Sequence, residues 1–152
     1  MAELYWECHS GISGDMVAGA LLDLGVSERT LRAQLETLPL SDWSLDISRV
    51  KRQGLAAVSF HISSHRTDAP HARTLPEIRE IFLRSGLSSA AKERALAVFS
   101  VLAEAEAVVH GCSVEQVHLH ETGADDSLLD VAAVAVGLDL LAPEEIWLSP
   151  LS

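Results

Sequence analysis

The sequence feature that most constrains the fold is an apolar segment at residues 126–141. Leu, Val and Ala make up most of it, so that a helix formed here is apolar on nearly every side. Such a helix has to be covered by neighbouring elements. Asp130 and Asp139 interrupt the segment, which leaves it short of an uncharged membrane span. We therefore predict a helix that its neighbours bury inside a globular chain.

The spacing of apolar residues predicts the other elements. The predicted order is βααββααβαβ, and the fold class is α/β or α+β, with a single mixed sheet of about five strands and packed helices. A length of 152 residues fits one domain covering residues 1–152. The predicted strands are 3–7, 43–50, 55–63, 117–121 and 146–149, and the predicted helices are 13–24, 27–38, 74–86, 88–110 and 126–141.

The composition argues against several classes of partner. The formal net charge is −11 and Lys and Arg are not clustered, so we expect no nucleic-acid binding. Cys8 and Cys112 lie far apart and form no CxxC motif, which argues against a disulfide framework or a structural zinc site. The N-terminus lacks the basic region of a signal peptide. We expect a cytoplasmic protein that is not bound to a membrane.

A polar stretch with two imidazoles and three carboxylates precedes the apolar helix. His118 and His120 have a spacing that points both to one face of a strand. Glu121 follows at the strand's end, where ligands collect in α/β proteins. Imidazole and carboxylate are the usual ligands of zinc, nickel and iron. The stretch predicts either a metal site that another element completes or a solvated strand. We interpret His61 and His110 as ordinary strand and helix-end residues.

A glycine-rich turn at residues 8–16 joins the first strand to the first helix. Its glycines let the backbone approach a ligand, and the helix N-terminus presents unpaired N–H groups. The turn could hold a phosphate or a carboxylate, although it matches no nucleotide motif. Asp15 could instead be a metal ligand or a general base, or could simply stabilise its own helix. We expect this turn and the stretch 117–126 to form two walls of one cleft.

Two other groups could carry chemistry. Asp126 and Asp130 lie one helical turn apart, so that their charges repel. Asp126 could be a helix cap, whereas Asp130 lies among apolar residues, where a carboxylate is costly unless it is paired or coordinated. We predict that Asp130 is either a buried ion-pair partner or functional. In the loop 64–73, His71 and Arg73 belong to a set that could clamp an anion, or that is only solvated.

These segments together resemble the LarC family. The resemblance rests on residues 11–16 (GISGDM), 19–26 (GALLDLGV) and 118–127 (HLHETGADDS), and it continues through SRVKR at 48–52, AEAE at 103–106 and LSPL at 148–151. It covers nearly the whole chain in one collinear register. The sequence departs from the family pattern at Glu7, Ala72 and Asp125. Asp125 stands where the family usually has an apolar residue.

The resemblance implies a function, cofactors and partners. The family inserts nickel into pyridinium bisthiocarboxylic acid mononucleotide, which makes the nickel-pincer cofactor of lactate racemase. It implies a CTP-dependent nickel insertase, a cyclometallase of the lyase class, of which this chain is the N-terminal domain. CTP, with Mg or Mn, is expected to bind only through the missing C-terminal nucleotide-binding region. Nickel(II) and the mononucleotide are the expected ligands, and a homo-oligomer is a further possibility.

The candidate residues receive the following expected roles. Asp15 and Glu121 are the candidate catalytic bases. Substrate binding is expected of Ser10, Gly11, Ser13, Gly14, His71 and Arg73, and nickel binding is expected of His118, His120, Glu121, Asp126 and Asp130. One alternative is a metal-dependent hydrolase in which Asp15, His118 and Asp126 hold the metal. The other alternative is a non-catalytic scaffold or oligomerisation module.

Overall fold

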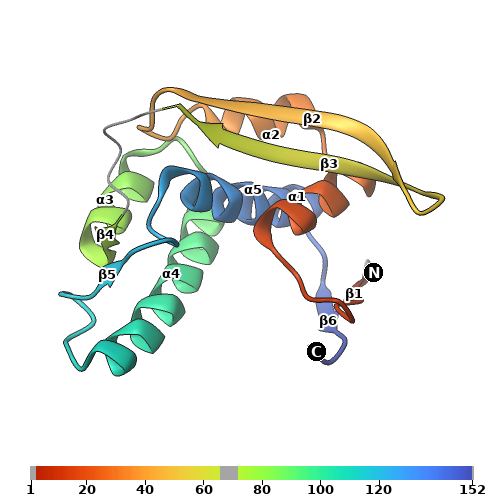
Figure 1. Ribbon diagram of the computed structural model, residues 1–152. Coiled ribbons are helices and arrows are strands. Elements are labelled where there is room, and N and C mark those ends of the chain that lie inside the picture. The colour runs from red at the N-terminus through yellow and green to blue at the C-terminus, as the bar shows by residue number, and fades with distance from the viewer. Residues whose placement is uncertain (1–2, 66–71, 152) are drawn as a thin grey trace.

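The computed structural model describes residues 3–65 and 72–151, which form helices and strands in a mixed fold (Figure 1). The element order differs from the prediction by one additional short strand, β4. The elements are β1 (Glu3–Trp6), α1 (Gly14–Asp23), α2 (Glu28–Leu35), β2 (Trp43–Arg52), β3 (Leu55–Ser64), β4 (Arg73–Thr74), α3 (Leu75–Arg84), α4 (Ser89–His110), β5 (His118–Leu119), α5 (Asp125–Leu141) and β6 (Glu145–Leu148).

The predicted single sheet is wrong. Among the described residues the strands form three separate two-stranded sheets: parallel β1–β6, antiparallel β2–β3 and antiparallel β4–β5. One reason lies at β3, where helix α1 packs alongside the strand. Gly19 makes this close approach possible, since an added Cβ would lie 2.5 Å from the carbonyl oxygen of Val58. A helix therefore occupies space beside the hairpin that a further strand would need.

Helix α5 is buried as predicted. It packs against α1, α2, α4 and β3, and Figure 1 shows it beneath the β2–β3 hairpin. Leu128, Leu129 and Ala132 are fully buried in the hydrophobic core. Gly137 lets α1 come close, because an added Cβ would lie 2.8 Å from Cδ1 of Leu21. No helix in the described part of the chain is long and apolar enough to cross a membrane.

The β2–β3 hairpin carries side chains toward the site. Its two-residue turn has positive φ at Gln53 (49°) and Gly54 (91°), the conformation that suits right-handed strand twist. The turn sets a register in which Arg52 pairs with Leu55 and Val50 pairs with Ala57. Side chains alternate along a strand, so that Val50 and Arg52 share one face. This predicted hairpin is confirmed.

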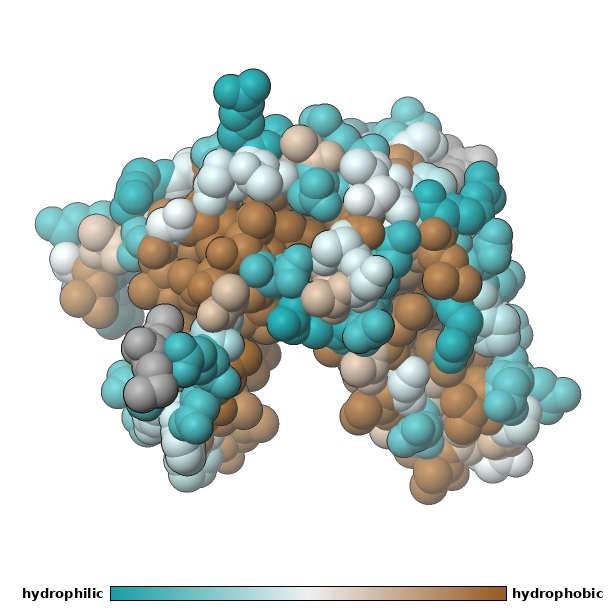
Figure 2. All heavy atoms as spheres, turned by 180° about the vertical axis from the view of Figure 1, so that it is seen from behind, coloured by the Kyte–Doolittle hydropathy of each residue, from teal (hydrophilic) through white to brown (hydrophobic). Residues whose placement is uncertain are grey.

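The molecule has the outline of an arch when it is seen from behind (Figure 2), with apolar surface on both projecting ends. One end carries the parallel β1–β6 pair, in which Tyr5 and Trp147 are exposed. The chain leaves β1 through Cys8, whose N–H donates to Ser149 Oγ at 2.8 Å. This hydrogen bond ties the turn before α1 to the residue that follows β6.

Candidate functional site

The first turn of α1 lies against the second turn of α5 at the predicted glycine-rich turn. Gly14 lies against Asp130, where an added Cβ would come within 2.9 Å of the Asp130 Cβ. Asp15 Oδ1 accepts hydrogen bonds from the Ser13 hydroxyl and, at 2.9 Å, from the Met16 N–H. Asp15 therefore stabilises the start of its own helix, and it also stands beside the carboxylate of Asp130. The helix-stabilising interpretation of Asp15 is thus confirmed, and its roles as a metal ligand and as a general base stay predictions.

Asp130 is the most perturbed carboxyl group of this site. Burial, followed by the negative charges of Asp15 and Asp126, raises its pKa to about 6, and only His61 acts in the opposite direction. Asp130 forms no ion pair with any residue that the structure describes. The predicted ion-pair role is thus not seen, and a carboxyl that titrates near neutral pH is a candidate functional group. Interpreting His61 as an ordinary strand residue overlooked its place beside this group.

The raised pKa of Asp130 predicts a pH-dependent stability. The carboxyl is protonated more readily in the folded chain than at its ordinary pKa of 3.8, so its contribution to stability is fully present below about pH 4 and is lost as the pH rises through about 6. We expect Asp130→Asn to stabilise the chain at pH 7.5 by about 1–2 kcal/mol, allowing for partial solvent screening. Thermal melts should show almost no difference near pH 4. An equal effect at both pH values would contradict the assignment.

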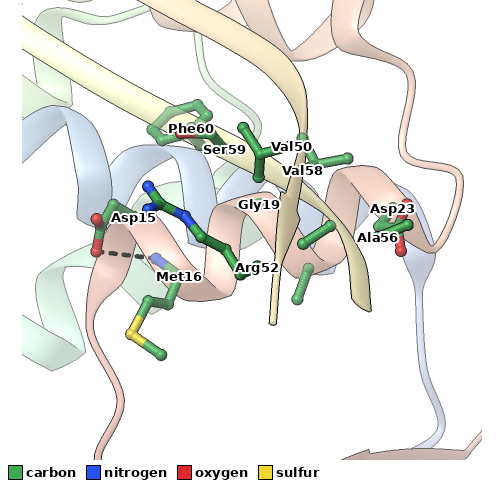
Figure 3. A pocket seen from close by; sticks show the side chains of 12 residues that line it. Asp15, Met16, Gly19, Asp23, Val50, Arg52, Ala56, Val58, Ser59 and Phe60 are labelled. Carbon is green, nitrogen blue, oxygen red and sulfur yellow. Dashed lines mark hydrogen bonds between the residues drawn. The ribbon is translucent and has the colours of Figure 1, made fainter. Parts of the chain in front are cut away.

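A cavity of about 430 Å³ lies between α1 and the hairpin (Figure 3). Asp15 and Met16 border it on the α1 side, and Phe60 borders it on the hairpin side. Figure 3 shows the Arg52 side chain reaching from the hairpin toward Asp15. Asp23 also lines the cavity, but Arg49 Nη1 pairs with its carboxylate at 2.6 Å. Arg52 was noticed in the sequence only as part of the resemblance, because nothing local indicates where its side chain points.

A second cavity of about 430 Å³ lies on the other side of the turn, where Ser13 and Gly14 face apolar residues of α4 and α5. Neither of these two cavities is lined by residues of the stretch 117–126. The expected cleft between that stretch and the turn is therefore not seen in either of them. Helix α5 reaches the turn instead, through Asp130.

Three histidines gather where α4 ends and β5 begins. The ring centroids of His118 and His120 are 6.5 Å apart, and that of His110 lies 6.2 Å from His120. His110 Nε2 is 3.3 Å from Glu106 Oε2. Sequence reasoning missed the place of His110 in this group, although His110 is the last residue of α4, the helix that precedes β5. Only His118–Leu119 pairs as a strand here, which is shorter than predicted.

The metal ligands stay predictions. Within residues 3–65 and 72–151, no three His, Cys, Asp or Glu side chains are grouped closely enough to hold a metal ion. Ligation by His118 and His120 would require their side chains to rotate. The same finding gives no support to a hydrolase site made of Asp15, His118 and Asp126. Asp126 does not cap α5, because Ala124 is the N-cap and no side chain caps this helix; Asp126 lies in the first turn, where its Oδ1 accepts from the Ser127 N–H at 2.8 Å and its charge favours the helix N-terminus.

Arg73 is buried and holds the loop between β5 and α5. Its Nη1 donates to the Gly123 carbonyl at 2.5 Å, and its Nη2 forms an ion pair with Asp125. Arg73 is 6% exposed and Asp125 is 2% exposed, so the pair is shielded from water. Asp125, which appeared in the sequence only as a departure from the family pattern, is a buried partner. An anion could reach the Arg73 guanidinium only by displacing Asp125. The role of Arg73 in substrate binding stays a prediction.

The other predicted residues occupy varied positions. Ser10 is exposed in the turn, where the Gly11 N–H donates to the Cys8 carbonyl at 3.1 Å and Gly11 has φ of 87°. Glu121 is exposed, and its backbone carbonyl accepts from the Ser127 hydroxyl at 3.2 Å. His71 lies outside the described residues. Substrate binding by Ser10, Gly11 and His71, and the catalytic and nickel-binding roles of Glu121, stay predictions.

The fold and the site define a class: a mixed helix-and-strand protein with a ligand-sized cavity beside protonatable carboxyl groups. The chain belongs to the nickel insertion protein family, whose sequence model, described as "Nickel insertion protein", matches residues 4–152. No solved structure matches the chain.

Curated relatives are similar over almost all of the chain. A putative nickel insertion protein of Roseiflexus castenholzii is 45% identical over 148 residues, which are 97% of this chain and 37% of the relative. The pyridinium-3,5-bisthiocarboxylic acid mononucleotide nickel insertion protein of Akkermansia muciniphila is 37% identical over 157 residues, covering 99% of this chain and 39% of the relative. The chain thus spans about two fifths of the length of these relatives.

Proposed function

We propose that this chain binds nickel and substrate in the insertion of nickel into pyridinium-3,5-bisthiocarboxylic acid mononucleotide. The substrate is the one in the name of the Akkermansia relative. The observation that carries the proposal is the meeting of α1 and α5, where Asp130 has a pKa of about 6 beside Asp15 and the cavity. A carbon–nickel bond forms with loss of a ring proton, and a base that titrates near the working pH accepts a proton effectively.

Within this proposal the carboxyl groups and the histidines have different tasks. Asp130 accepts the ring proton, with Asp15 beside it, while Glu121 is the alternative base. Nickel(II), which is a substrate here, binds to the imidazoles of His118 and His120, and His110 is close enough to join them after side-chain rotation. The ion then passes to the sulfur atoms of the mononucleotide, which are softer ligands.

Further parts of the proposal concern the longer protein. We infer a CTP-dependent cyclometallase of the lyase class that serves lactate racemase maturation in the cytoplasm. CTP, with Mg or Mn, would bind to the part of the relatives that lies outside the residues they share with this chain. Contact with that region and formation of a homo-oligomer are part of the same proposal.

A transfer experiment tests the proposed function. The chain is loaded with one equivalent of radioactive nickel(II) and mixed with the mononucleotide, with CTP and with the region that the longer relatives have in addition. Gel filtration then separates the protein from small molecules. We expect nickel to move into the mononucleotide fraction faster than from nickel chloride alone. Transfer at the same rate without this chain would contradict the proposal.

A further inference from the structure

We propose that the cavity between α1 and the hairpin is the binding site of the mononucleotide and that Arg52 binds its phosphate. This inference rests on the proposed function and deepens it, because it assigns the substrate to one cavity and one cation. The cavity volume of about 430 Å³ lies within the range of roughly 300–1,000 Å³ that is usual for small-molecule sites.

Arg52 is the cation of this cavity that is free to bind an anion. It forms no ion pair with a described residue, whereas Arg49 on the same strand is bound to Asp23. Figure 3 shows that its side chain crosses the cavity toward Asp15. A guanidinium group forms two parallel hydrogen bonds to a phosphate, which makes it a specific phosphate ligand.

The walls of the cavity suit the rest of the ligand. Met16, which is exposed, and Val50, which lies on the same strand face as Arg52, supply apolar surface for a flat ring. The Asp15 carboxylate attracts the positive ring nitrogen, whereas the phosphate and the two thiocarboxylates are repelled by Asp15 and attracted by Arg52. The cavity thus presents one free cation and one carboxylate without an ion-pair partner among the described residues, since Asp23 is paired with Arg49, to a ligand that carries a ring cation, a phosphate and two thiocarboxylates.

Equilibrium binding of the mononucleotide and of its dephosphorylated nucleoside to the whole chain tests this assignment. We expect the wild-type chain to bind the mononucleotide at least tenfold more tightly than the nucleoside. Arg52→Met should remove this preference while leaving nucleoside binding unchanged. Lys51→Met is the matched control, because it removes the same charge from the opposite face of the same strand. It should retain the preference.

The other outcomes are decisive as well. If Arg52→Met and Lys51→Met lost the preference for the mononucleotide equally, the effect would be one of net charge and the proposed site would be wrong. The proposed site would also be wrong if Arg52→Met kept the preference. In either case the proposed function would stand if nickel transfer still occurred. Failure of the wild-type chain to bind the mononucleotide would overturn the inference, and the transfer experiment would then decide separately on the function. A second variant, Ala57→Phe, fills the cavity and should weaken binding of both ligands. Thermal melts check that each variant is folded.

Discussion

Asp125→Ala is expected to lower the free energy of unfolding by about 3–5 kcal/mol, because it leaves the buried charge of Arg73 without its partner. The same change frees the loop at Gly123, whose carbonyl binds the same guanidinium group. Urea denaturation at neutral pH measures the loss.

The neighbouring Asp126→Ala is the matched control, because Asp126 is exposed and forms only a local hydrogen bond. We expect it to cost about 0.3–1 kcal/mol, because it removes a carboxylate from the first turn of α5. The double variant Arg73→Met with Asp125→Leu removes both charges and should recover most of the stability. If Asp125→Ala proved no more destabilising than Asp126→Ala, the ion pair would not hold this loop.

The second large effect concerns nickel. His118→Ala combined with His120→Ala should weaken nickel(II) binding by about hundredfold or more. Even partners that only support a metal ligand typically change affinity 10- to 100-fold, and direct ligands should matter at least as much. Isothermal titration calorimetry of the whole chain measures the affinity. His110→Ala should reduce nickel affinity less than the double variant, because His118 and His120 are the proposed main ligands and His110 only joins them after side-chain rotation.

His65→Ala controls for nickel that binds to any exposed imidazole. His65 is exposed, and its Nε2 lies 2.8 Å from the Ser44 hydroxyl on the hairpin. We expect its replacement to leave nickel affinity unchanged. An affinity that falls equally for His65→Ala and for the double variant would mean that nickel binds without a specific site.

The helices could be predicted because their signals are local. The predicted helix at 88–110 is observed as α4, Ser89–His110, and Gly111 ends it with φ of 64°. The predicted helix at 74–86 is observed as α3, Leu75–Arg84, which begins with a capping box formed by Thr74 and Glu77. Apolar periodicity and capping residues act within a few turns of the chain, so that the sequence alone carries them.

The sheet could not be predicted because strand pairing depends on distant residues. β1 and β6 lie at opposite ends of the chain, and nothing in either strand specifies the other. β4 has two residues, too few for an alternating pattern. The contact of α1 with β3 depends on the absence of a side chain at Gly19, which the sequence does not relate to Val58.

The candidate site was partly predictable. The unusual position of Asp130 follows from its apolar neighbours in the sequence, and its raised pKa agrees with that expectation. The places of Arg52, His61 and His110 depend on packing between elements, so that residue type and spacing did not indicate them. For Arg73 the residue type was misleading, because an arginine, which is typical of anion binding, is buried here in an ion pair with Asp125.

The central claim is that imidazoles of this chain hold nickel before the mononucleotide receives it. X-ray absorption at the nickel edge tests it most directly, on the whole chain loaded with one equivalent of nickel(II). We predict scattering from at least two imidazoles in the wild-type chain, its loss in the variant lacking His118 and His120, and nickel–sulfur scattering once the mononucleotide is added. A spectrum with only water and carboxylate ligands, identical in the wild-type chain and the variant, would contradict the claim.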